Sequence, residues 1–185
     1  CERFGREFAL VFEDQGGLSL TELVKQTELS SNECHEIVAQ LELILSKIDE
    51  NHLFHGDISP DNVLITASGE VQLIDFGQYE PKGKIIGTPI YMSPERWSGK
   101  APDIKSDLFS LGLIEKWLLS SEIFSRKTPG FVTAILFSDE SSNYLSKDPY
   151  QRKFMGRSSQ LETRRKLAQK VLALESHSSQ TQAIE

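Results

Sequence analysis

The sequence predicts a mainly α-helical domain that carries one small β-hairpin. Apolar residues recur at three- and four-residue steps in several long segments, as in amphipathic helices, and two short β-branched runs joined by a glycine-containing turn predict the hairpin. The composition agrees: 185 residues, with 38% hydrophobic and 25% charged side chains, are typical of one globular domain or a large piece of a bigger protein.

The charge and the cysteines limit the class of protein. A net charge of −7 disfavours nucleic-acid partners, because phosphate contacts need clustered cations. No apolar stretch approaches the ~20 residues of a membrane-spanning helix, and no secretory leader opens the chain. Cys1 and Cys34 lack the spacing of a disulfide framework or a metal site. We therefore expect a cytoplasmic protein that binds neither nucleic acid nor membrane.

The first part of the chain predicts a strand, a short helix and a long helix. Residues 8–12 (FALVF) are typical of a short buried strand, and residues 18–25 fit a short helix. Ser30 and Ser31 are candidate N-caps for a helix that runs to about Asn51. This helix has one apolar stripe, formed by Ile37, Leu41, Ile44, Leu45 and Ile48.

The hairpin is expected at residues 63–66 and 71–74, with Gly69 in the turn, and residues 77–94 are loop-like because they are rich in Gly, Pro and Lys. Further helices are expected at about residues 106–119, 131–137 and 160–174, and a frayed tail beyond them. The last helix has four candidate core positions: Leu161, Leu167, Val171 and Leu172.

A polar loop, HGDISPDN at residues 55–62, precedes the first hairpin strand. Asp57 and Asn62 bracket this loop, and Asp75 ends the second strand, so the hairpin brings two carboxylates and one amide oxygen to one end of the sheet. Neighbouring carboxylates repel one another unless a cation neutralises them, and so few oxygen ligands suit Mg²⁺ completed by water or phosphate oxygens. On these residues alone, an interpretation in which Asp57 and Asp61 merely cap turns is equally good.

The neighbouring motifs favour the magnesium interpretation. HGDISPDN resembles the catalytic loop H-R-D-x-x-x-x-N of eukaryotic-like (Hanks-type) protein serine/threonine kinases. Its D-I-S-P-x-N motif is similar to the motif of bacterial members of this family. Other motifs stand in the family's order and spacing and resemble its hinge, metal-binding triplet, activation-segment end, central helix and late D-P-x-x-R element: LVFEDQGG (10–17), DFG (75–77), GTPIYMSPE (87–95), SDLFSLG (106–112) and LSKDPYQR (145–152). The resemblance covers about residues 8–174.

The resemblance implies a site for ATP and Mg²⁺. Asp57 would accept or orient the proton of a hydroxyl on a protein substrate, while Asn62 and Asp75 would hold Mg²⁺ on the nucleotide phosphates. Leu64 would form the floor of the adenine pocket. The hinge would complete it, with Phe12 as gatekeeper and the backbone from Glu13 to Gln15 bonded to the adenine edge.

The resemblance also implies supporting roles. Thr88 would steady the substrate-side loop, and Asp107 would brace the catalytic loop through backbone amides around His55. Glu95 would pair with Arg152 in a mostly buried ion pair. The residues with implied structural roles are His55, Phe76, Thr88, Glu95, Asp107 and Arg152.

Two substitutions depart from the family's pattern. Gly56 stands where an arginine normally clamps a phosphorylated activation segment, so we expect activity that does not depend on such phosphorylation. Ser59 stands where serine/threonine kinases usually carry a lysine that touches the transferred phosphoryl group, a variation that the bacterial relatives share.

The family's glycine-rich loop and phosphate-pairing lysine are not found before the hinge, so we expect a C-terminal lobe without its N-terminal lobe. The expected divisions are residues 1–17 for the end of an N-lobe strand and the hinge, 18–174 for the C-lobe and 175–185 for a flexible tail. The apolar surface around Phe12, Leu64 and Phe76 would then be exposed, which favours an N-lobe or a regulatory protein as a partner.

Two alternatives remain. HGD…N is also the wording of aminoglycoside- and choline-type phosphotransferases, but SPE, DLFSLG and DPYQR belong to the protein-kinase pattern. A catalytically silent binding module is the second alternative. The missing upper lobe favours it, and the intact Asp57, Asn62 and Asp75 argue against it.

Overall fold

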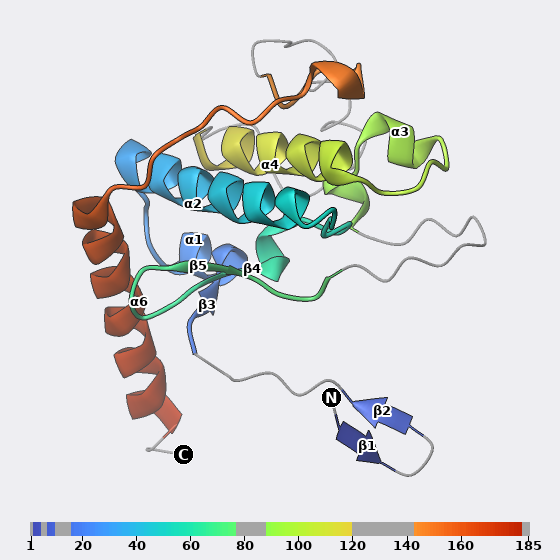
Figure 1. Cartoon of the computed structure of the whole chain (residues 1–185). Helices are drawn as coiled ribbons and strands as arrows, with labels where there is room; N and C mark the ends of the chain where they lie inside the picture. Colours follow the sequence, from blue (N-terminus) through green and yellow to red (C-terminus); the bar gives the residue numbers. More distant parts are fainter. Residues whose placement is uncertain (1, 5–6, 10–15, 77–87, 120–142, 183–185) are drawn as a thin grey trace.

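The computed structural model describes residues 2–4, 7–9, 16–76, 88–119 and 143–182 (Figure 1). Two long helices, α2 (Ser31–Glu50) and α4 (Ile104–Leu119), lie side by side, and α6 (Leu161–Gln182) packs near the start of α2 and runs steeply away from it. A short helix α1 (Leu20–Gln26) precedes α2, and α3 (Pro94–Trp97) precedes α4. This architecture confirms the expected mainly helical fold.

Two small antiparallel sheets accompany the helices. The strands β1 (Glu2–Phe4) and β2 (Glu7–Ala9) pair with each other. The second sheet has the order β3-β4-β5, and its strands are β3 (Leu18–Ser19), β4 (Val63–Ile65) and β5 (Val71–Leu73). The predicted hairpin is therefore confirmed as β4 and β5, but the sheet also contains β3, which the sequence analysis assigned to the start of a helix.

Helices α1 and α2 both begin with a reciprocal cap. The Ser30 hydroxyl accepts a hydrogen bond from the Glu33 amide, while the Glu33 carboxylate accepts one from the Ser30 amide, so the predicted cap at Ser30 is confirmed. Ser19 and Glu22 make the same exchange at α1. Because these bonds satisfy amides that a helix leaves unpaired at its start, the local sequence determines where both helices begin.

The core lies between α2, α4, α6 and the hairpin. In the predicted stripe of α2, Ile37, Leu41 and Leu45 are fully buried, and Ile44 and Ile48 pack at the edge of the same core. Every one of the five positions predicted for α2 therefore contributes to the core.

The last helix differs from its prediction in two ways. Leu167 and Val171 are fully buried, whereas Leu161 and Leu172 are 63% and 51% exposed, so those two core assignments were wrong. At about 100° per residue, both point away from the helix face that carries Leu167 and Val171. The helix also continues to Gln182, into the segment that was expected to fray.

The loop region and the helix bounds needed smaller corrections. Within the segment predicted as loop, residues 89–91 form a 3-10 turn and Pro94 begins α3, while α4 begins at Ile104, before the predicted start. Most of the predicted strand at 8–12 and the whole predicted helix at 131–137 lie outside the described residues. No helix in the described part of the chain is both long and apolar enough to cross a bilayer.

Gln40 of α2 fastens the hairpin to the helical core. Its buried side chain accepts a hydrogen bond from the Val71 amide (3.0 Å) and donates one to the Gly69 carbonyl (3.2 Å). The Gly69 turn also abuts α6, where a Cβ at this position would collide with the Arg164 carbonyl oxygen. The hairpin that carries the polar loop is therefore held by two helices, which limits how far its ends can move.

Candidate active site

Asp107 of α4 holds the start of the polar loop. Its Oδ2 accepts a hydrogen bond from the His55 amide (2.6 Å), and its Oδ1 accepts one from the Gly56 amide (2.9 Å). Burial raises the pKa of Asp107 to about 7, and the two amide hydrogen bonds act in the opposite direction. The contact is the one that the resemblance implied, while its value for catalysis stays a prediction.

His55 joins the loop to the end of β5. Its Nε2 lies 2.9 Å from the Ile74 carbonyl oxygen, and its Nδ1 lies 3.3 Å from the Asp57 amide, which can only donate. This pattern assigns a neutral ring that is protonated on Nε2 and donates to Ile74. Burial lowers the pKa of His55, although Asp57 and Asp75 oppose that shift. The imidazole therefore acts as a neutral cross-link, and it also packs against the Phe76 ring at a centroid distance of 4.6 Å.

Asn62 is fixed in orientation by the loop itself. Its Nδ2 donates to the Asp57 carbonyl oxygen (2.9 Å), so Oδ1 is the atom that remains able to bind a cation. Its own backbone carbonyl accepts a hydrogen bond from the Ile74 amide (3.1 Å), which ties the start of β4 to the end of β5.

Asp75 follows directly after that link and turns out of the strand. It is exposed, and its φ of 54° lies in the left-handed region, which aspartate tolerates better than most residues. Ile74 makes backbone hydrogen bonds to Asn62 and to the His55 side chain, which lie at the two ends of the polar loop. The backbone of Asp75, the next residue, therefore lies beside both ends of the loop. Asp57 and Asp75 both lie close enough to His55 to oppose the lowering of its pKa by burial, and Asn62 donates a hydrogen bond to the Asp57 carbonyl, so Asp57, Asn62 and Asp75 lie at neighbouring backbone positions.

The donor set fits Mg²⁺. It offers two carboxylates and one amide oxygen, which are hard oxygen ligands, and it contains no thiolate or free imidazole nitrogen that would favour a softer metal. Among the described residues, no cluster of three or more His, Cys, Asp and Glu side chains forms a self-sufficient metal centre.

Thr88, the first described residue after the gap at 77–87, contacts the loop. Its backbone amide donates to Asp57 Oδ1 at 2.8 Å, so that oxygen already accepts one hydrogen bond. Gly56, between His55 and Asp57, has a φ of +83°, a backbone conformation that side chains disfavour and glycine adopts freely.

Arg152 ties α3 to α4 and to the segment after residue 143. It is fully buried and donates from Nη2 to Glu95 Oε2 (3.0 Å), from Nη1 to the Lys105 carbonyl (2.9 Å) and from Nε to the Ser146 carbonyl (2.8 Å). The Glu95 carboxylate also pairs with Nη1 at 2.5 Å. Burial opposes ionisation of Glu95, but the hydrogen bonds from Arg152 outweigh it and lower the pKa of Glu95.

The nucleotide side of the site is described in part. Leu64 is half-buried on β4, where it pairs with Ser19 and Gln72 across the sheet. Phe12, Glu13 and Gln15, the predicted hinge residues, lie outside the described residues.

Sequence reasoning missed Gln40, which fastens the hairpin. A signal for it existed, because this amide interrupts the apolar stripe of α2 between Ile37 and Leu41, and a polar side chain on a buried face needs a hydrogen-bond partner. The partners themselves, the Gly69 turn and Val71, could not be read from that signal.

Comparison with known proteins decides the family. Residues 3–183 match the family model described as protein kinase domain. The chain belongs to the protein kinase family. The expected Hanks-type kinase is thereby confirmed, and the relatives below are serine/threonine kinases by name.

Three relatives illustrate the similarity. The chain is 34% identical over 122 residues to serine/threonine-protein kinase max-2 of Caenorhabditis elegans, covering 62% of this chain and 19% of the relative. It is 35% identical over 145 residues to serine/threonine-protein kinase C of Synechocystis (70% and 26%). It is 33% identical over 129 residues to mouse serine/threonine-protein kinase PAK 1 (64% and 23%). The matched region thus spans about a quarter or less of each of these relatives.

Proposed function

We propose that the chain is the C-terminal lobe of a protein serine/threonine kinase, which transfers the γ-phosphate of ATP to hydroxyl groups of a protein substrate. The observation that carries this proposal is the bonded circuit around the polar loop. Asp57 bonds to Asn62, Asn62 bonds to Ile74, and Ile74 bonds to His55, so the hydrogen bonds hold together the backbone that bears the three proposed catalytic residues. Family membership and the kinase relatives support the general function.

The residues divide the work as follows. The Thr88 amide already donates to Oδ1 of Asp57, so Oδ2 would orient the substrate hydroxyl and accept its proton. Oδ1 of Asn62 and the carboxylate of Asp75 would hold Mg²⁺, which supplies charge neutralisation for the phosphates when bound. Phosphoryl transfer depends mainly on positioning and on electrostatic stabilisation, so fixing these groups on a tightly bonded loop is the protein's main contribution.

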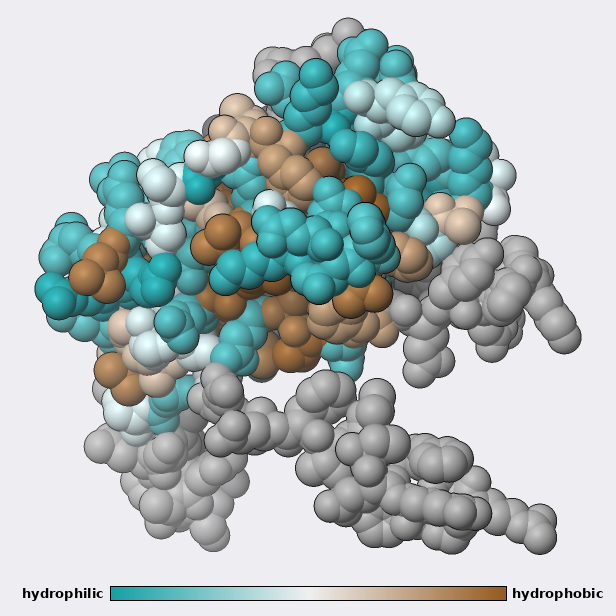
Figure 2. Space-filling view, in the orientation of Figure 1, coloured by the Kyte–Doolittle hydropathy of each residue, from teal (hydrophilic) through white to brown (hydrophobic). Residues whose placement is uncertain are grey.

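Exposed apolar side chains near the polar loop support the proposal that another domain or protein completes the site. Leu53, Phe54 and Phe76 are 58%, 37% and 52% exposed, and Figure 2 shows apolar side chains exposed in the middle of this face of the molecule. A grouped apolar surface marks an interface more often than a free surface. We propose that an N-terminal lobe, or a regulatory protein in its place, covers Phe76 and closes the adenine pocket above Leu64.

The test is phosphate transfer from labelled ATP to a serine/threonine peptide library by the longest protein that contains this chain. Asp57→Asn is expected to lower kcat by about 10²- to 10⁴-fold, the typical contribution of a positioned general base. Asp75→Ala is expected to lower the rate and to raise the Mg²⁺ concentration needed for half-maximal activity, because it removes a proposed Mg²⁺ ligand. The matched control is Asp61→Ala, because Asp61 is an exposed carboxylate in the same loop.

Unchanged turnover in both the Asp57 and the Asp75 variants would refute the proposed chemistry. A protein that neither binds Mg-ATP nor transfers phosphate would instead favour the catalytically silent binding module. Transfer to small amino alcohols or aminoglycosides, with none to peptides, would favour the small-molecule phosphotransferase.

A further inference from the structure

The last helix reaches back to the segment that leads out of the predicted hinge. The Gly17 amide donates a hydrogen bond to Glu175 Oε1 at 2.9 Å, across 158 residues of sequence. A Cβ at Gly16 would lie 3.7 Å from the same carboxylate oxygen, so Glu175 faces both glycines. In Figure 1 the lower half of α6 passes beside the chain that enters β3.

Gly17 is confined on its other side by the sheet. Its φ is +115°, and a Cβ there would lie only 2.7 Å from the Ile65 carbonyl oxygen, so only glycine fits between β4 and α6. The next residues, Leu18 and Ser19, pair with Ile65 and Leu64 of β4. Glu175 therefore holds the backbone directly before β3, the strand that pairs with Leu64 of the predicted pocket floor.

Glu175 lies on a helix that is packed against the core and tied to the start of α2. It follows Val171 by one turn of α6, and Val171 is fully buried. On the same helix, the Lys170 ammonium donates to the Glu33 carboxylate (2.8 Å) and to the Glu28 carbonyl (2.7 Å), which ties α6 to the start of α2. Because α6 is held in place, the Glu175 carboxylate can fix the backbone of Gly16 and Gly17, which have little conformational preference of their own.

We propose that Glu175 is a positioning residue for nucleotide binding, acting through Gly17 and β3 on the predicted pocket floor at Leu64. This inference rests on the proposed function, because it assumes that Leu64 lines an adenine pocket. A hydrogen bond from a backbone amide to a carboxylate is stronger than a neutral one, and holding Gly17 and β3 in the bound conformation reduces the ordering that binding requires. Loss of the carboxylate should therefore weaken nucleotide binding and leave the phosphoryl-transfer step unchanged.

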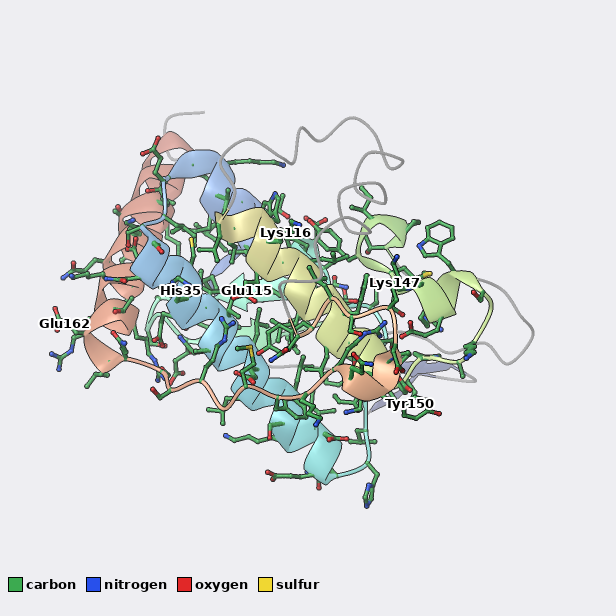
Figure 3. The ribbon with its side chains drawn as sticks, turned by 90° about the horizontal axis from the view of Figure 1, so that it is seen from above. His35, Glu115, Lys116, Lys147, Tyr150 and Glu162 are labelled. Carbon is green, nitrogen blue, oxygen red and sulfur yellow. The ribbon has the colours of Figure 1, made fainter. Side chains whose placement is uncertain are left out.

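The experiment compares Glu175→Ala, Glu175→Gln and Glu162→Ala in the longest protein that contains this chain. Glu162 is the matched control, because it lies on the same helix, its side chain is 73% exposed, and it projects from the outer side of the molecule (Figure 3). Steady-state kinetics give KM for Mg-ATP and kcat separately. Amide hydrogen exchange at Gly17, followed by NMR, reports the contact without any nucleotide.

Glu175→Ala is expected to raise KM for Mg-ATP by about 5- to 10-fold, as for loss of one typical intramolecular hydrogen bond, with kcat within twofold of the parent. Its Gly17 amide should exchange about tenfold faster, since the amide loses its acceptor. Glu175→Gln keeps an acceptor oxygen and should recover most of both losses, and Glu162→Ala should match the parent.

Three results would overturn the proposal. The first is unchanged exchange at Gly17 in Glu175→Ala, which would mean that Glu175 does not hold Gly17. The second is a joint fall in kcat and melting temperature that glutamine does not rescue, as expected of a merely structural residue. The third is a parent protein that binds no nucleotide. In that case the proposed function fails with it, and the Gly17 exchange still shows whether the contact itself exists.

Discussion

Removal of the Arg152 side chain is expected to destabilise the protein strongly. The guanidinium is fully buried and donates to the Glu95 carboxylate and to two backbone carbonyls, at Lys105 and Ser146. It also lies 4.7 Å from the centroid of the Phe109 ring. These contacts join α3, α4 and the segment after residue 143, so one substitution disconnects three parts of the structure.

The magnitude follows from what the substitution leaves behind. In Arg152→Ala, the Glu95 carboxylate, only 10% exposed, loses its cation, and two part-buried carbonyls lose their donor. Breaking a buried ion pair from one side typically costs about 3–5 kcal/mol. For a domain of this size, that corresponds to a fall in melting temperature on the order of 10 °C.

The pH dependence provides an independent check. The pKa of Glu95 lies below its ordinary value of 4.5 in the folded protein. Between the two values the unfolded chain binds more protons than the folded one, so the pair's contribution is fully present above pH 4.5 and is lost as the pH falls through the folded pKa. Arg152→Ala should therefore flatten the acid limb of the stability curve.

Urea unfolding followed by circular dichroism, at neutral pH and in steps down to about pH 3, measures both effects. Arg165→Ala is the control, because its ion pair with Glu162 is exposed (69% and 73%), and exposed pairs contribute at most about 1 kcal/mol. A loss below 1 kcal/mol in Arg152→Ala, equal to that of the control, would refute the reasoning that this pair is buried and structural.

Two further predictions concern the hairpin. Gly69→Ala should lower the free energy of unfolding by about 1–3 kcal/mol, because φ at this position is +78° and the new methyl would collide with the Arg164 carbonyl. Gly99→Ala, with a φ of +84° and open space around it, is the control in thermal unfolding. Equal losses in the two variants would contradict the clash. Gln40→Ala leaves the buried Val71 amide without its acceptor, so it should lower the free energy of unfolding in urea by about 1–3 kcal/mol and speed hydrogen exchange of that amide. Unchanged exchange would contradict the role of Gln40 in holding the hairpin.

Much of the architecture was predictable because its signals are local. The caps at Ser19 and Ser30 depend on residues three positions away, and the stripe of α2 depends on the helical period, so both could be read from neighbouring residues. The hairpin followed from a glycine turn between two β-branched runs. The polar loop and its motifs predicted that Asp57, Asn62 and Asp75 come to one end of that hairpin.

Other features depended on contacts between distant parts of the chain. Leu161 and Leu172 satisfy an apolar pattern, yet the packing of α6 selects the face with Leu167 and Val171 and leaves those two exposed. The pairing of β3 with β4 and the reach of Glu175 to Gly17 join segments far apart in sequence. Local periodicity carries no information on such pairs, because which surfaces meet is settled by how whole helices and strands pack together.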